Sequence, residues 1–164
     1  GTGSGKTTLA NAILALPSFA EDRVFLIEDT AELQCAALDK VELLTKRSDP
    51  PVTMTDLVRD SLRLRPDRII IGEVRDGSAL DLLKAWNTGH PGGLATIHAN
   101  SAYEGLTRLE DLIGEVTQRI PYRAIAQAIN VLVFIRRTKE GRRIDTIARV
   151  TGRDGDSYAI ENIA

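Results

Sequence analysis

The first eight residues of the chain, Gly-Thr-Gly-Ser-Gly-Lys-Thr-Thr, constrain its fold more than any other stretch. A glycine-rich turn that ends in Gly-Lys-Thr and leads directly into a helical run, here up to Leu16, is the pattern of a phosphate-binding loop. Glycines let backbone N–H groups approach a ligand closely, and the helix directs the positive end of its dipole at the same point. The pattern predicts a polyphosphate site formed by Gly3, Ser4, Gly5, Lys6, Thr7 and Thr8.

Two side chains of this loop have separate expected roles. Lys6 is expected to reach the β- and γ-phosphates of a nucleotide, and the Thr7 hydroxyl to bind the accompanying Mg²⁺. The complete loop pattern starts with a glycine that would stand one residue before Gly1, and a strand precedes such loops. We therefore expect the sequence to be a piece of a longer protein that begins inside its phosphate loop. The alternative, a flexible glycine-rich terminus before an ordinary helix, predicts no site.

Three apolar runs lead into polar side chains that are suited to chemistry. The runs at 23–27, 68–72 and 94–97 read as parallel strands buried on both faces, and they lead into Glu28, Glu73 and His98. Because open α/β sheets bind ligands at the carboxyl ends of their strands, we expect these side chains near the phosphate loop. A phosphate-loop NTPase needs a strand-end acid, and Glu73 fits the activation of the attacking water. The alternative is a set of strand-end charges that face solvent.

The two histidines of the chain flank the third of these strands. His98 stands at the strand end, where it can donate a hydrogen bond toward a γ-phosphate and report hydrolysis. Thr96 lies two residues earlier and shares its face of the strand. His90 precedes the strand, and both a structural and a nucleotide-binding role remain open for it.

The complete pattern predicts an α/β fold with a mainly parallel sheet flanked by helices and an antiparallel strand extension at the C-terminus. Helices are expected at 7–16, 79–86 and 122–129, around Leu57–Leu62 after a cap at Thr53 or Thr55, and from Ser101 past Ile113. Asp76 or Ser78 is expected to cap the helix at 79–86, and Gly89 to follow its end. A short edge strand at 41–44 is also expected. The extension comprises strands at 131–136, 142–150 and 158–163, with turns at Gly141 and at 152–156.

Composition excludes several classes of protein. The 164 residues suffice for one domain, and the single cysteine, Cys35, rules out an internal disulfide and a Cys₄ zinc site. A net charge of −2 and an aromatic content of 4% argue against a basic groove that handles nucleic acid. The longer apolar runs are far too short to span a bilayer, so a cytoplasmic domain is expected.

Four stretches occur in an order that resembles a known family: GTGSGKTT, VFLIEDTAEL, LRLRPDRIIIGEVR and TGHPGGLATIHANSA. They resemble the phosphate loop, Asp box, atypical Walker B segment and His box of the secretion, or traffic, ATPases of type II and type IV secretion systems. The stretches IEDTAELQC and LLKAWNTGHPGGLATIHANSAYEGLTRLEDLI look closest to the conjugal-transfer, TrbB-like branch. The resemblance covers residues 1 to 110.

The resemblance implies a RecA-like core that binds ATP and Mg²⁺, with residues 1–164 as the C-terminal ATPase domain. Position by position, it implies that Lys6 and Thr7 bind phosphate and Mg²⁺, that Glu28 is the Asp-box acid and a metal ligand, that Glu73 is catalytic, and that His98 with His90 is the His-box sensor. It implies a hexameric ring on the cytoplasmic face of the inner membrane, with secretion-channel or coupling proteins as partners. It also implies an N-terminal domain that supplies arginines to the site, without which 1–164 would be weak or inactive.

Two other functions remain compatible with the sequence. A RecA-like helicase that acts directly on DNA would share the loop and the strand-end glutamate, although composition disfavours it. A nucleotide-gated assembly scaffold would bind ATP with slow turnover, and the sequence does not separate it from a motor.

Overall fold

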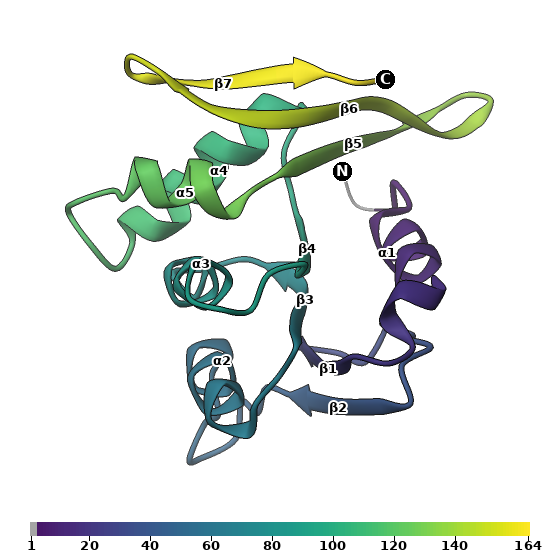
Figure 1. Cartoon of the computed structure of the whole chain (residues 1–164), viewed down its shortest axis with the longest axis vertical. Coiled ribbons are helices and arrows are strands. Elements are labelled where there is room, and N and C mark those ends of the chain that lie inside the picture. The colour runs from purple at the N-terminus through teal and green to yellow at the C-terminus, as the bar shows by residue number, and fades with distance from the viewer. Residues whose placement is uncertain (1–2) are drawn as a thin grey trace.

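The computed structural model describes residues 3–164, so Gly1 and Thr2 of the predicted phosphate loop lie outside the described residues. Two sheets and their covering helices make up the described chain (Figure 1). The helices are α1 (Lys6–Leu14), α2 (Met54–Ser61), α3 (Ala79–Asn87), α4 (Ala102–Gly114) and α5 (Tyr122–Ala128), with short 3₁₀ helices at Pro17–Phe19 and Leu62–Leu64. The strands are β1 (Arg23–Glu28), β2 (Asp39–Leu44), β3 (Arg68–Val74), β4 (Leu94–Ile97), β5 (Val131–Thr138), β6 (Gly141–Asp154) and β7 (Ser157–Asn162).

A parallel sheet in the order β2-β1-β3-β4 forms the core. Parallel alignment brings the carboxyl ends of the strands to one edge. Glu28 is the last residue of β1, Glu73 is the penultimate residue of β3, and His98 directly follows β4. The predicted parallel sheet is confirmed, and the expected short edge strand at 41–44 is longer than predicted because β2 starts at Asp39.

Helices cover both faces of this sheet, with α1 on one side and α2 and α3 on the other (Figure 1). In β3, Ile69 and Ile71 pack with the residues of α2, α3 and α4, whereas Ile70 packs on the α1 side against Ala10 and Leu14. The three isoleucines are fully buried, and each contributes about 1.5–3 kcal/mol through its removal from water. Burial on both faces explains the unbroken apolar run and holds the carboxyl edge of the sheet in place.

The last three strands form an antiparallel sheet in the order β5-β6-β7, which confirms the predicted extension. Val150 and Tyr158 of this sheet join the same buried cluster as Leu106 of α4 and Ile125 of α5. The turn predicted at 152–156 is shorter than expected. Gly152 lies inside β6 with φ of 142°, where the pairing with β7 shifts register, and only residues 155–156 form the turn.

The helix ends follow the predicted capping signals, with one correction at the end of α1. Thr53 caps α2 because its hydroxyl accepts the N–H of Asp56 at 3.2 Å, while the Asp56 carboxylate accepts the N–H of Thr53 at 2.9 Å. Of the two residues predicted at the start of α3, Asp76 is the one that binds the backbone: its Oδ1 accepts the N–H of Ser78 at 2.9 Å, whereas the Ser78 hydroxyl makes no capping hydrogen bond. The first helix ends at Leu14 rather than at residue 16. None of the helices within residues 3–164 has both the length and the apolar composition needed to cross a membrane.

Candidate functional site

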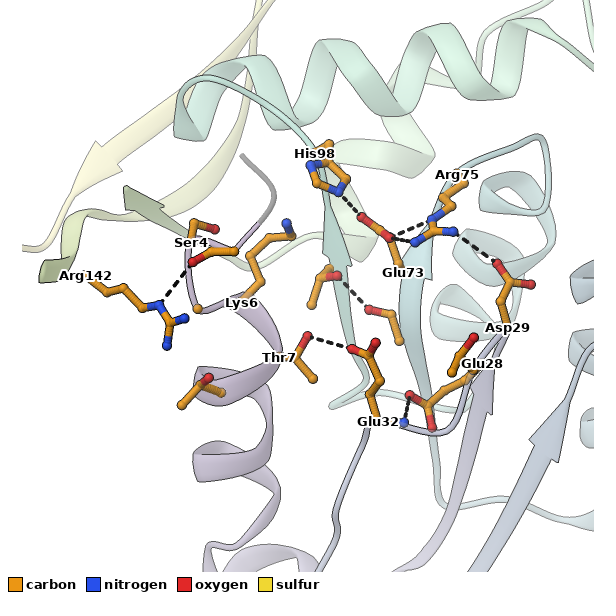
Figure 2. A pocket seen from close by; sticks show the side chains of 16 residues that line it. Ser4, Lys6, Thr7, Glu28, Asp29, Glu32, Glu73, Arg75, His98 and Arg142 are labelled. Carbon is orange, nitrogen blue, oxygen red and sulfur yellow. Dashed lines mark hydrogen bonds and ion pairs between the residues drawn. The ribbon is translucent and has the colours of Figure 1, made fainter. Parts of the chain in front are cut away.

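A pocket of about 430 Å³ opens between the carboxyl edge of the parallel sheet and the amino end of α1 (Figure 2). Its walls come from the glycine-rich loop, from the ends of β1, β3 and β4, and from the start of β6. The lining residues are Gly3, Ser4, Gly5, Lys6, Thr7, Thr8, Glu28, Asp29, Thr30, Glu32, Gly72, Glu73, Arg75, Thr96, His98 and Arg142. The structure therefore brings together every predicted site residue except His90.

The glycine-rich loop has the geometry of an anion cradle. Gly5 immediately precedes α1 with φ of 98°, a left-handed conformation that favours glycine, and the helix starts at Lys6. The first N–H groups of a helix have no partner within it, and those of Lys6, Thr7 and Thr8 make no backbone hydrogen bond among residues 3–164, so they can bind a ligand. Ser4 is 3% exposed, and its hydroxyl has no hydrogen-bond partner within residues 3–164. A buried hydroxyl without a partner is costly, which suits a loop that closes around a polar ligand.

Lys6 supplies a positive charge to the pocket on the side of β3 and β4. Its side chain extends from the start of α1 toward the ends of these strands (Figure 2). Within the described part of the chain, its ammonium group forms none of the ion pairs. The charge is therefore available to an anionic ligand.

Glu73 projects from β3 into the pocket with a side chain that is 15% exposed. Its Oε2 accepts a hydrogen bond from Arg75 Nε at 2.6 Å and contacts Arg75 Nη2, and its Oε1 contacts His98 Nε2. Arg75 Nη1 also lies 3.7 Å from Asp29 Oδ2. The hydrogen bond to Glu73, together with the charge of that carboxylate, raises the pKa of Arg75. Glu73 Oε2 is thus held by Arg75, whereas the buried Oε1 touches His98 but has no hydrogen-bond partner within residues 3–164.

His98 lies where β4 ends, between Glu73 and Lys6 (Figure 2). Burial lowers the pKa of His98, the Glu73 carboxylate acts in the opposite direction, and the Lys6 ammonium lowers it further. The neutral imidazole is therefore favoured relative to a free histidine. Thr96, on the same strand, donates its hydroxyl to the carbonyl of Gly72 at 2.6 Å, which ties β4 to β3 beside the acid.

Glu28 lines the pocket, but its carboxylate turns toward the loop that follows β1. Its Oε1 accepts the N–H groups of Glu32 and Leu33, both at 3.0 Å, and the residue is 6% exposed. Burial raises the pKa of Glu28, while these two hydrogen bonds act to lower it. A side chain at position 72 would touch it, because a Cβ built on Gly72 lies 2.9 Å from Glu28 Cγ. Glu28 thus shapes the wall of the pocket through its packing and its two backbone bonds.

The predicted metal ligands fit a cation that is held mainly by phosphate. In the range 3–164, no three His, Cys, Asp or Glu side chains gather as a metal site of their own. The Thr7 hydroxyl faces the pocket and lies 3.4 Å from Glu32 Oε2. Mg²⁺ keeps several waters and takes few protein ligands beside substrate phosphates, which suits the Thr7 hydroxyl at this position. Metal binding by Glu28 stays a prediction, with one of its oxygens already bound to the backbone.

His90 is the one predicted site residue that the structure does not bring to the pocket. Its Nδ1 lies 2.9 Å from the carbonyl oxygen of Pro66, which precedes β3. This contact is at the amino ends of the strands, whereas the pocket is at their carboxyl ends. The sequence left a structural and a nucleotide-binding role open for His90, and its contact with Pro66 away from the pocket favours the structural role.

The lining residues that were not identified from the sequence as members of the site include Asp29, Thr30, Glu32, Arg75 and Arg142. Arg75 could have been identified from the sequence. Residues two apart on a strand share a face, and Arg75 lies two positions after Glu73. No sequence pattern places Arg142 in the site, since it contacts Gly3, from which it is separated by 139 positions in the sequence.

Comparison with known proteins gives consistent matches. The family model described as "Type II/IV secretion system protein" matches residues 1–151. The conjugal transfer protein TrbB of Rhizobium radiobacter is 50% identical over 166 aligned positions, which cover 100% of this chain and 50% of that protein. The type IV secretion system protein PtlH of Bordetella pertussis is 38% identical over 167 positions, covering 94% of this chain and 48% of PtlH. The chain spans about half the length of the curated relatives it matches.

Among solved structures, the VirB11 ATPase from the Brucella suis type IV secretion system, in complex with sulphate, superimposes with a TM-score of 0.80. It is 31% identical, and the match covers 90% of this chain and 46% of that one. The predicted RecA-like architecture with its antiparallel extension is thereby confirmed.

Proposed function

The chain belongs to the family of type II/IV secretion system proteins, and we propose that it is an ATPase domain that powers type IV secretion, in the form of conjugative DNA transfer or pilus assembly. The observation that carries this proposal is the meeting of Lys6, Glu73 and His98 in one pocket. These residues come from the phosphate loop and from two strand ends, and their convergence supports a site for phosphate chemistry.

In this proposal the nucleotide phosphates bind in the loop of residues 3–8. The free N–H groups at the start of α1, the unpartnered Ser4 hydroxyl and the Lys6 ammonium provide donors and positive charge for them. The Thr7 hydroxyl and the Glu28 carboxylate would be the protein ligands of Mg²⁺. The bound Mg²⁺ supplies charge neutralisation at the phosphate that is transferred.

The chemistry we propose is in-line attack of water on the γ-phosphate, with Glu73 as the proton acceptor. Oε2 of Glu73 is hydrogen-bonded to Arg75 and Oε1 lies against His98, so one of these contacts must open before the carboxylate can hold a water. The His98 contact is the easier one to open, because the lowered pKa of His98 favours its neutral form, whereas the Arg75 guanidinium contacts Oε2 through two nitrogens. Arg75 keeps the other oxygen and so orients the freed Oε1 toward the pocket.

The wider assembly is also a proposal. We propose a homo-oligomeric ring, with six subunits as the expected number, on the cytoplasmic face of the inner membrane and in contact with secretion-channel or coupling proteins. Direct binding of nucleic acid is not part of this proposal, because the net charge is −2 and few aromatic side chains are available to stack on bases.

The test is ATP turnover and binding by the full-length protein and two variants. Glu73→Gln should lower kcat by about 10²–10⁴ and leave ATP affinity nearly unchanged, because general base catalysis contributes on this scale. Lys6→Ala should lose binding. Glu42→Gln is the matched control, since Glu42 is an exposed acid of the β2 edge that pairs with Lys40 at 3.5 Å outside the pocket.

Turnover by Glu73→Gln at the parent rate would contradict the catalytic assignment. A nucleotide-gated scaffold gives a different result: Glu73→Gln would support DNA transfer as well as the parent, while Lys6→Ala would abolish assembly.

A further inference from the structure

Arg142 lies at the start of β6, yet it contacts the phosphate loop at the other end of the sequence. Its Nε donates a hydrogen bond to the carbonyl oxygen of Gly3 at 3.0 Å. The β5–β6 hairpin, which carries it, extends past the body of the antiparallel sheet toward the amino end of α1 (Figure 1). This contact links the antiparallel extension directly to the predicted nucleotide site.

The aliphatic part of Arg142 packs closely on Gly5. A Cβ built on Gly5 would lie 2.9 Å from Arg142 Cδ and 3.6 Å from its Nε, so a side chain at position 5 would displace the arginine. Glycine is therefore favoured at position 5 for two reasons: the backbone has a positive φ, and Arg142 occupies the space that a side chain would need.

The rest of the Arg142 guanidinium is available to a ligand. Within residues 3–164, its two terminal nitrogens take part in no hydrogen bond or ion pair, and Arg142 lines the same pocket as Thr8. Figure 2 shows Arg142 on one side of the phosphate loop, with Glu73 and His98 on the other. Arg142 thus lies across the loop from the two strand-end residues assigned to the γ-phosphate.

We propose that Arg142 is a nucleotide-binding residue that contacts the phosphates common to ADP and ATP; this inference rests on the proposed function. Loop amides and the following helix hold the α- and β-phosphates in such sites, and Arg142 lies along this loop on the side away from Glu73. A guanidinium presents parallel N–H groups that match a phosphate, and its Nε bond to Gly3 holds it in orientation. The antiparallel extension thereby completes the nucleotide site.

The test is equilibrium binding of ADP and of a non-hydrolysable ATP analogue to the full-length protein at two salt concentrations. Arg142→Ala should weaken both ligands about tenfold and to the same degree, on the scale of one charge-assisted hydrogen bond at an exposed position. The affinity of the Arg142→Ala variant for both nucleotides should also depend less on salt concentration, because one charge–phosphate contact is lost. Arg143→Ala is the matched control, since it removes the same charge from the next, exposed position of β6.

Arg142→Gln separates ligand binding from support of the loop, because glutamine can still donate to Gly3 but carries no charge. We expect it to bind like Arg142→Ala. Parent-like affinity in Arg142→Gln, an unchanged salt dependence in Arg142→Ala, or a loss confined to the ATP analogue would each overturn the inference while leaving the proposed function intact. A parent protein that binds neither nucleotide would overturn the proposed function itself.

Discussion

Gly72 offers a sharp test of how the pocket wall is packed. It lies in β3 directly before Glu73, and a Cβ at this position would stand 2.9 Å from Glu28 Cγ and 3.1 Å from Glu28 Oε1. Non-bonded carbons prefer a separation of about 3.5–4.0 Å. Glu28 cannot move aside freely, because its Oε1 holds the N–H groups of Glu32 and Leu33. Gly72→Ala is therefore expected to destabilise the folded chain.

The clash in Gly72→Ala can be relieved in two ways, and both give a similar loss of folding free energy. If the strands shift, forcing a methyl group into a packed region costs about 1–3 kcal/mol. If Glu28 moves instead, a buried N–H group loses its acceptor, which also costs about 1–3 kcal/mol. A cost of about 2 kcal/mol lowers the Tm by about 4–8 °C for a chain of this size. Thermal and urea unfolding of the parent and the variant measure it.

Gly105→Ala is the matched control for this substitution. Gly105 lies inside α4, where an added Cβ meets Ile97 and Leu132 only at 3.9 and 4.0 Å. Alanine is favoured over glycine in a helix by about 1 kcal/mol, so this variant should gain stability. In a Glu28→Ala background the clashing Cγ is absent, and Gly72→Ala should then cost little. A Gly72→Ala protein that melts like the parent, or whose cost is the same in both backgrounds, would refute the reasoning.

Two further predictions concern pH. Burial raises the pKa of Glu28, so the folded state favours its protonated form, and stability is lost as pH rises from about the ordinary 4.5 through the raised value. Glu28→Gln keeps an acceptor for Glu32 and Leu33 without the charge, so urea unfolding should find it more stable than the parent at pH 7 and similar at pH 4; a variant less stable at pH 7 would contradict this. Burial lowers the pKa of His98, so the folded state favours neutral imidazole and stability falls as pH drops below about 6.5. His98→Asn should lose less stability than the parent between pH 8 and pH 5, and equal losses in the two proteins would rule the assignment out.

The sequence alone predicted the features that depend on local chemistry. The glycines before Lys6 need positive φ and a close approach to a ligand, so they mark the loop wherever it lies in the fold. The apolar runs before Glu28, Glu73 and His98 predicted buried parallel strands, and parallel strands share a carboxyl edge. The convergence of these side chains on one pocket therefore follows from the sequence pattern.

Only the tertiary structure decided which way several side chains turn and what they meet. Spacing gave no indication that Glu28 binds the backbone of the next loop, or that His90 contacts the Pro66 carbonyl instead of the pocket. Arg142 reaches Gly3 because β6 packs against the helices that cover the core. This packing brings together residues that are 139 positions apart in the sequence. Sequence patterns report the geometry of a few neighbouring residues, whereas long-range contacts depend on how whole layers stack, which no local spacing records.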